Sequence, residues 1–224
     1  MLDVTGGAMY EMGGRIHLVF GQDFQGGYVS GKNGIYSKQI RSFDINDDGA
    51  SLSISNISIT PETEAYRRRD LNVFPVIRNN ELDEGLVVLS GVFTGNFGVW
   101  SVLVEIDANG LPTMADPAAP KTFKQAMNNY HSAKLGLYSE AREEMHELLF
   151  GGITLQYYDE ESQQFLTDNT VVGHIFFGGG SLPMRLTSAT VLQPSRTHLI
   201  VCLKWFWSKS PNHPVLCFLQ LCSR

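Results

Sequence analysis

The feature that most constrains the fold of this chain is a repeated pattern of strands and glycines. In each repeat a polar segment comes first, an apolar strand then ends at glycine, and a strand with an aromatic residue leads into an acidic turn. Asp70 lies 21 residues before Gly91, and His131 lies 21 residues before Gly152. The same count back from Gly21 reaches the start of the chain. Such periodicity is typical of one structural unit stacked several times, and it predicts units at about 1–69, 70–130 and 131–171.

The first 168 residues predict strands joined by tight turns. Short runs of β-branched or alternating apolar residues favour strands, and they occur at residues 15–20, 52–59, 86–89 and 99–106. Glycine-containing acidic segments at 46–49 and 107–110 can supply the positive φ angles that hairpin turns need. Residues 139–149 favour a helix on propensity alone, whereas the repeat makes them a turn between strands at 134–138 and 145–150. The chain is therefore predicted to be all-β and mostly antiparallel.

The repeat resembles the kelch-type β-propeller, in which each unit is a four-stranded blade. The matching features are strands that end at Phe20-Gly21, Leu89-Ser90-Gly91 and Phe150-Gly151-Gly152, each followed by a strand with Tyr36, Trp100 or Tyr158. Glycine at a strand end allows close backbone approach, and a large aromatic side chain buries area between blades. The resemblance covers about residues 1–168 and implies two to three blades. The alternative fold is a β-sandwich whose strands also end in glycine.

A propeller closes with about four to eight blades, so two complete units and part of a third are too few for a ring. We therefore expect that the rest of the propeller is missing from this chain, which makes the chain a fragment, or that the chain is an open array. The segments 20–24 and 66–72 also resemble propellers of secreted Bacteroidetes proteins. That resemblance implies an extracellular or cell-surface protein with signal and sorting segments that this sequence lacks.

Composition narrows the classes of partner. The formal net charge of −6 argues against a nucleic-acid binder, because phosphate contacts need a basic surface. The only basic run, residues 67–69, is expected to be a solvated or ion-paired loop. No apolar run approaches the roughly 18 residues of a spanning helix, so no transmembrane segment is predicted.

Catalytic and metal-binding patterns are sparse. The six histidines show no metal-ligand spacing, and the chain has no P-loop, dinucleotide fingerprint or nucleophile elbow. Kelch propellers include copper oxidases whose cofactor joins a tyrosine to a cysteine, but residues 1–168 contain no cysteine. We therefore predict no catalytic residue, no metal and no cofactor. The strand histidine His17 is expected to be structural.

If a ligand site exists, it should lie among the loops that open the innermost strands. These segments hold Tyr66, Arg69 and Asp70 in one unit, and Tyr130 and His131 in the next. Aromatic and charged side chains together could contact a sugar or a peptide. The competing interpretation is that Arg69, Asp70 and His131 bond to backbone and hold neighbouring blades together.

Two functions follow from these observations. The first is a non-catalytic propeller module that binds a glycan or protein as part of a larger, secreted bacterial protein. The alternative is a propeller enzyme acting on a sugar, resembling the sialic-acid mutarotase family, with Arg69, Asp70 and His131 binding a carboxylate and transferring a proton.

The end of the chain differs in composition from the rest. Residues 169–224 contain five basic residues, no acidic residue and all three cysteines, whereas residues 1–168 hold all 23 acidic residues. This change predicts that residues 172–224 do not continue the fold naturally, as a shifted reading frame would produce. The alternatives are a divergent partial blade and an interfacial membrane-binding segment.

Overall fold

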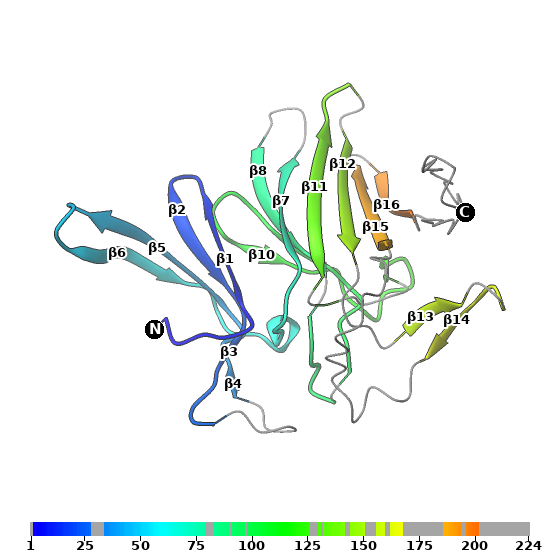
Figure 1. Cartoon of the computed structure of the whole chain (residues 1–224), viewed down its shortest axis with the longest axis horizontal. Helices are drawn as coiled ribbons and strands as arrows, with labels where there is room; N and C mark the ends of the chain where they lie inside the picture. The colour runs from blue at the N-terminus through cyan, green and yellow to red at the C-terminus, as the bar shows by residue number, and fades with distance from the viewer. Residues whose placement is uncertain are drawn as a thin grey trace, which may run out of the picture.

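The computed structural model contains three four-stranded antiparallel sheets, each with its strands side by side in chain order (Figure 1). It describes residues 2–27, 34–78, 83–89, 91–96, 98–125, 130, 132–141, 144–150, 156–159, 162–167, 186–193 and 196–201. In this part of the chain the only helix is the 3-10 turn η1 (Glu64–Tyr66), so no helix there could span a bilayer. The prediction of an all-β, antiparallel protein is confirmed.

The three sheets follow one another along the chain. Sheet 1 contains β1 (Ala8–Met12), β2 (Arg15–Val19), β5 (Ile40–Asp47) and β6 (Leu52–Ile59). Sheet 2 contains β7 (Val73–Arg78), β8 (Asp83–Val88), β9 (Val104–Ile106) and β10 (Pro112–Thr113). Sheet 3 contains β11 (Ala133–Ser139), β12 (Glu144–Phe150), β15 (Leu186–Gln193) and β16 (Arg196–Val201).

Sheets 1 and 3 share a further feature, a small hairpin inserted between the second and third strands. Sheet 1 has β3 (Gln22–Asp23) and β4 (Ile35–Tyr36), and sheet 3 has β13 (Gln156–Asp159) and β14 (Gln164–Thr167). Sheet 2 has the segment 89–103 at the same place, where Val92 bridges Val99. The first strands β1, β7 and β11 lie in the middle of the molecule, and the sheets extend outward from them (Figure 1).

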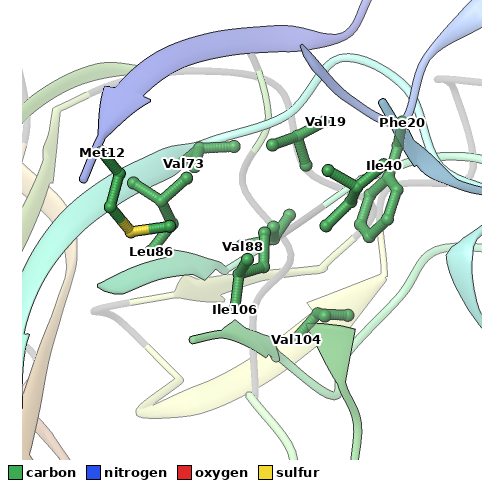
Figure 2. Packing of buried hydrophobic residues seen from close by; sticks show 9 residues of the cluster. All are labelled: Met12, Val19, Phe20, Ile40, Val73, Leu86, Val88, Val104 and Ile106. Atoms are coloured by element: carbon green, nitrogen blue, oxygen red, sulfur yellow. The ribbon is translucent and has the colours of Figure 1, made fainter. Parts of the chain in front are cut away.

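Sheet 2 lies between the other two sheets, and both of its faces are buried. One cluster joins it to sheet 1 and contains Met12, Val19, Phe20, Ile40, Val73, Leu86, Val88, Val104 and Ile106 (Figure 2). The second cluster joins it to sheet 3 and contains Phe74, Val76, Val87, Leu89, Leu103, Met145 and Leu149. The uninterrupted apolar run at residues 86–89 is explained by this position, because alternate side chains enter opposite clusters.

The predicted strands at 15–20, 52–59 and 86–89 are confirmed within a residue or a few at each end. The strand predicted at 99–106 is shorter, since only Val104–Ile106 pairs in the sheet. Trp100 instead contacts the neighbouring loops, with its backbone N–H donating to the Gly91 carbonyl at 3.1 Å and its indole Nε1–H to the Arg67 carbonyl at 2.8 Å.

The helix that propensity alone favours for residues 139–149 is absent, and the hairpin predicted from the repeat is confirmed. β11 and β12 pair from Ala133 with Phe150 to Ser139 with Glu144. Met145, Glu147 and Leu149 are buried on alternate positions of β12, facing sheet 2. Burial with a period of two outweighs the modest helix propensity of these residues.

Two turn predictions are confirmed. Gly49, with φ of +80°, lies in the turn between β5 and β6, and Gly110, with φ of +79°, lies in the turn between β9 and β10. The Asp107 carboxylate accepts hydrogen bonds from the Asn109 and Leu111 amides at 2.9 and 2.8 Å. An aspartate at the first position thus holds the β9–β10 turn in shape.

Part of the compositionally distinct end belongs to sheet 3. Residues 186–201 contribute β15 and β16, and β15 pairs with β12 from Met145–Leu192 to Phe150–Leu186. Strands pair through backbone groups, which any translated sequence carries. The presence of β15 and β16 therefore does not test the frame-shift hypothesis, which stays a prediction.

Candidate functional site

The segment between β6 and β7 carries three of the five predicted site residues. Thr63 begins η1 by accepting a hydrogen bond from the Ala65 amide. Tyr66 stacks on Phe20 with ring centroids 5.2 Å apart, and its hydroxyl donates to the Pro112 carbonyl at 2.8 Å. Burial raises the pKa of the Tyr66 hydroxyl, so the proton that it donates is retained. Tyr66 therefore joins the end of β2 to β10 in the next sheet.

The three consecutive arginines each lie over an aromatic ring. Their guanidinium carbons are 3.9 Å from the Tyr36 centroid for Arg67, 4.5 Å from Trp100 for Arg68 and 5.2 Å from Phe93 for Arg69. Such stacking stabilises a cation, and its effect grows when water is excluded. The expectation of a solvated loop is wrong for Arg68, which is 0% exposed.

Arg68 is held by few polar partners. Its Nε donates to the Ala65 carbonyl at 3.2 Å, Nη2 contacts the Met114 sulfur at 2.8 Å, and Nη1 has no hydrogen-bond partner. Burial lowers the pKa of the Arg68 guanidinium to about 9. The group is still charged at pH 7, so the Trp100 ring faces a desolvated cation.

Arg69 and Asp70 connect three parts of the chain through their backbone. The Arg69 amide donates to the Val92 carbonyl at 2.6 Å, and the Val92 amide returns a bond to the Arg69 carbonyl at 3.0 Å. The Asp70 amide donates to the Gly6 carbonyl at 2.6 Å, just before β1. The Arg69 Nε lies 3.8 Å from an Asp70 carboxylate oxygen. These backbone bonds fit the interpretation in which the two residues hold neighbouring units together.

The segments that precede β1, β7 and β11 meet one another. We call residues 5–7, 69–72, 130 and 132 the entry segments. The Asp70–Gly6 bond joins the first two, and the Asn72 side-chain oxygen accepts a hydrogen bond from the Ser132 amide at 3.4 Å. Tyr130, a predicted site residue, is half-buried in the third. His131 lies outside the described residues.

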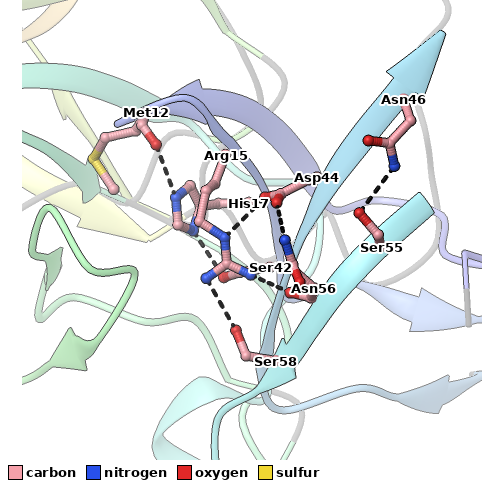
Figure 3. Close-up of polar contacts among 9 residues, drawn as sticks. All are labelled: Met12, Arg15, His17, Ser42, Asp44, Asn46, Ser55, Asn56 and Ser58. Atoms are coloured by element: carbon pink, nitrogen blue, oxygen red, sulfur yellow. Dashed lines mark hydrogen bonds and ion pairs between the residues drawn. The ribbon is translucent and has the colours of Figure 1, made fainter. Parts of the chain in front are cut away.

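A polar network covers part of sheet 1 (Figure 3). His17 is buried, with its Nδ1 2.8 Å from the Ser42 hydroxyl and its Nε2 3.2 Å from the Met12 carbonyl. Burial lowers the pKa of His17, so the ring is neutral at pH 7 and serves as a hydrogen-bonding core residue, as expected. Nearby, Arg15 pairs with Asp44 at 3.1 Å, and the Asn56 amide also donates to that carboxylate.

A second polar group, not predicted from the sequence, ties the three first strands together. The Tyr10 hydroxyl of β1 donates to the Val73 carbonyl of β7 at 2.7 Å. Lys134 of β11 donates to the same carbonyl at 2.7 Å and to the Tyr10 oxygen at 2.8 Å. One lysine, one tyrosine and one carbonyl thus fix the centre of the molecule.

Glu147 lies close to this centre and is the most unusual buried group. Its side chain is 0% exposed, and neither carboxyl oxygen has a hydrogen-bond partner. It is opposite Gly136, where an added Cβ would lie 3.2 Å from the carboxyl oxygen. Burial raises the pKa of Glu147 to about 8, although the Lys134 charge opposes the shift. The carboxyl is therefore largely protonated at pH 7.

Sequence reasoning missed Lys134 and Glu147 because neither belongs to a motif with a recognisable spacing. Their positions in the strands are informative, because both residues lie on the face of the β11–β12 hairpin that packs on sheet 2. Among the described residues, no group of three or more histidine, cysteine or acidic side chains could hold a metal ion.

Comparison with known proteins adds no relative. No protein-family model matches the chain, and no curated protein matches it. The arguments for function therefore rest on the residues and their geometry.

Proposed function

We propose that this chain is a non-catalytic binding module, built as part of a kelch-type β-propeller in a larger secreted bacterial protein. Its ligand is a glycan or a protein, bound on the entry segments. Three consecutive four-stranded sheets with their first strands together support the propeller interpretation. In a propeller, radial repetition brings equivalent loops of successive blades onto one surface.

The observation that carries this proposal is the contact among the entry segments of all three sheets. Gly6 contacts Asp70, and Asn72 contacts Ser132, so the segments before β1, β7 and β11 adjoin one another. Arg69 and Tyr130 are the side chains that the second and third segments contribute to the proposed binding surface. A composite surface of this kind suits an extended ligand better than a single deep pocket does.

The chemistry of the surface supports a polar ligand. The Arg69 side chain is 11% exposed and its Nε makes no hydrogen bond. A guanidinium presents several donors in a planar fork that matches carboxylates. Tyr130 supplies an aromatic ring in the neighbouring entry segment, and aromatic rings with nearby polar groups are common where sugars or peptides bind.

Binding to a glycan array, and capture of protein ligands by the immobilised chain, test the proposal. For a ligand found in this way, we expect Arg69→Lys to weaken binding about tenfold, or roughly 1.4 kcal/mol, because lysine lacks the planar fork. Tyr130→Phe tests the second entry segment. Lys121→Ala, at an exposed position outside the entry segments, should bind as the original chain does.

Stability must be measured beside binding, because Arg69 also contacts Phe93. If Arg69→Ala lowers the free energy of unfolding while every variant binds normally, the residue is structural and the proposed surface is wrong. Catalysed interconversion of sugar anomers, followed by NMR, would instead establish the enzyme alternative and reject a non-catalytic module.

A further inference from the structure

Each sheet has two faces, which can be named by their neighbours. The forward face points toward the next sheet along the chain, and the rear face points the opposite way. The forward face of sheet 1 packs on the rear face of sheet 2, and the forward face of sheet 2 packs on the rear face of sheet 3. The same type of face-to-face contact is therefore used twice within the chain.

Equivalent residues make these contacts. Tyr10 pairs with His17, Phe74 with Val87 and Leu135 with Leu148, and each partner lies four residues before Gly21, Gly91 or Gly152. By the same register, Met12 and Val76 correspond to Leu137. Tyr10 and Met12 pack toward sheet 2, and Phe74 and Val76 pack toward sheet 3.

The forward face of sheet 3 carries the corresponding side chains without a covering sheet in the described part of the chain. Leu135 is 46% exposed and Leu137 is 48% exposed. Leu148, beside Leu135 on β12, completes an apolar surface at the position where sheets 1 and 2 bury theirs. Exposed apolar surface of this kind is a common mark of an interface.

The rear face of sheet 1 is the matching surface at the other end. A row across all four strands contains Met9, Leu18, Arg41 and Ile59. Met9 corresponds in register to Val73, which packs sheet 2 against sheet 1. Met9 and Ile59 are exposed, and so are Ile45, Leu52 and Ile54 farther along the same face.

We infer that two copies of this chain associate head to tail, with the forward face of sheet 3 in one copy packed on the rear face of sheet 1 in the other. The occupant is a second copy, in place of further blades of the same polypeptide, because the two faces without a covering sheet among the described residues are equivalents of faces that already bind each other inside the chain. A half-turn about the centre forms this contact twice, and it gives six four-stranded sheets, within the range in which propellers close.

The mass of the full chain in solution tests this inference, independently of any ligand. Light scattering coupled to gel filtration should give twice the chain mass. Leu135→Lys and Ile59→Lys, each placing a charge on one of the two faces, should both give the single-chain mass. The control is Leu111→Lys, since Leu111 is an equally exposed leucine in the β9–β10 turn, and it should keep the double mass.

Mixing the two defective variants separates a head-to-tail contact from a symmetric one. Leu135→Lys keeps an intact sheet 1 face and Ile59→Lys keeps an intact sheet 3 face, so the mixture can form one unbroken contact. We expect a mixed dimer, weaker than the original. A single-chain mass for the unmodified protein, a ladder of larger species, or no mixed dimer would each overturn the inference. Circular dichroism of every variant shows whether it is folded.

Discussion

At the scale of single residues, charged side chains with few polar partners lie at the contacts between sheets. Arg68 is buried against Trp100, and Glu147 is buried between sheets 2 and 3. A buried charge is costly unless it is paired or neutralised. Arg68 is stabilised by an aromatic face, whereas Glu147 keeps its proton. The two residues therefore respond differently to pH.

Glu147 predicts a fall in stability as the pH rises. Its pKa is about 8 in the folded chain against an ordinary value of 4.5, so the unfolded chain loses this proton first. Between pH 4.5 and 8 its contribution to the free energy of unfolding should decrease by up to about 1.4 kcal/mol per pH unit. Glu147→Met, of similar length and without charge, should remove this decrease and be more stable at pH 8 by about 1–4 kcal/mol.

Urea unfolding at pH 5 and pH 8 checks this difference. Glu140→Met is the matched control, because Glu140 is exposed in the turn of the same hairpin. The control should follow the pH dependence of the original chain. Equal pH dependence in the original chain and in Glu147→Met would show that the buried carboxyl does not control stability.

Parts of the candidate site that repeat along the chain could be predicted from the sequence, whereas residues that occur singly could not. The entry segments were found because their spacing repeats at 21 residues before a glycine. The interpretation in which Arg69 and Asp70 hold neighbouring units together fits their backbone bonds, whereas the bond from the Tyr66 hydroxyl to Pro112 is not foreseeable from the sequence. Lys134 and Glu147 gave no pattern, because their significance arises from contacts with strands more than 60 residues away or from burial alone.

At the scale of elements, turns and glycines were the most informative residues. The β5–β6 and β9–β10 hairpins follow from their acidic, glycine-containing turns. The β11–β12 hairpin could not be separated from a helix by local propensity, because its burial pattern is imposed by sheet 2. Tertiary packing overrides propensity where the two disagree.

Glycine at the end of β2 should be irreplaceable. Gly21 has φ of +90°, and an added Cβ would meet the Val4 side chain and lie 2.8 Å from the Gly7 nitrogen. Gly13 also has a positive φ, of +61°, but its nearest neighbour would be 3.7 Å away. Both alanine variants carry a backbone penalty of about 1 kcal/mol, and Gly21→Ala should lose a further 1–3 kcal/mol, roughly, from overpacking.

Thermal or urea unfolding of the two variants measures that difference. An equal loss for Gly21→Ala and Gly13→Ala would mean that close approach is not the reason for glycine at the strand end. Far-ultraviolet circular dichroism provides a broader check on the elements. Strand should dominate the spectrum, and a helix content above roughly a quarter would contradict the fold.

At the scale of the whole molecule, three similar sheets share a centre at Tyr10, Val73 and Lys134. The last two strands of sheet 3 come from the segment without acidic residues. The frame-shift hypothesis predicts that another reading frame near codon 172 continues the acidic strand-and-turn pattern. Translation of the coding DNA in the two other frames tests it, and the divergent-blade alternative takes its place if neither frame does so.

The central claim is that the sheets are arranged radially, with first strands together and fourth strands apart. Pulsed electron resonance can compare two spin-labelled pairs, with the native cysteines replaced and the labelled protein diluted in unlabelled chain. One pair joins Glu11 of β1 to Leu137 of β11, and the other joins Ser53 of β6 to Thr197 of β16. The strands β6 and β16 lie at opposite sides of the molecule in Figure 1. We predict a much shorter distance for the first pair. A fourth-strand distance equal to or shorter than the first-strand distance would contradict the radial arrangement and indicate a sandwich.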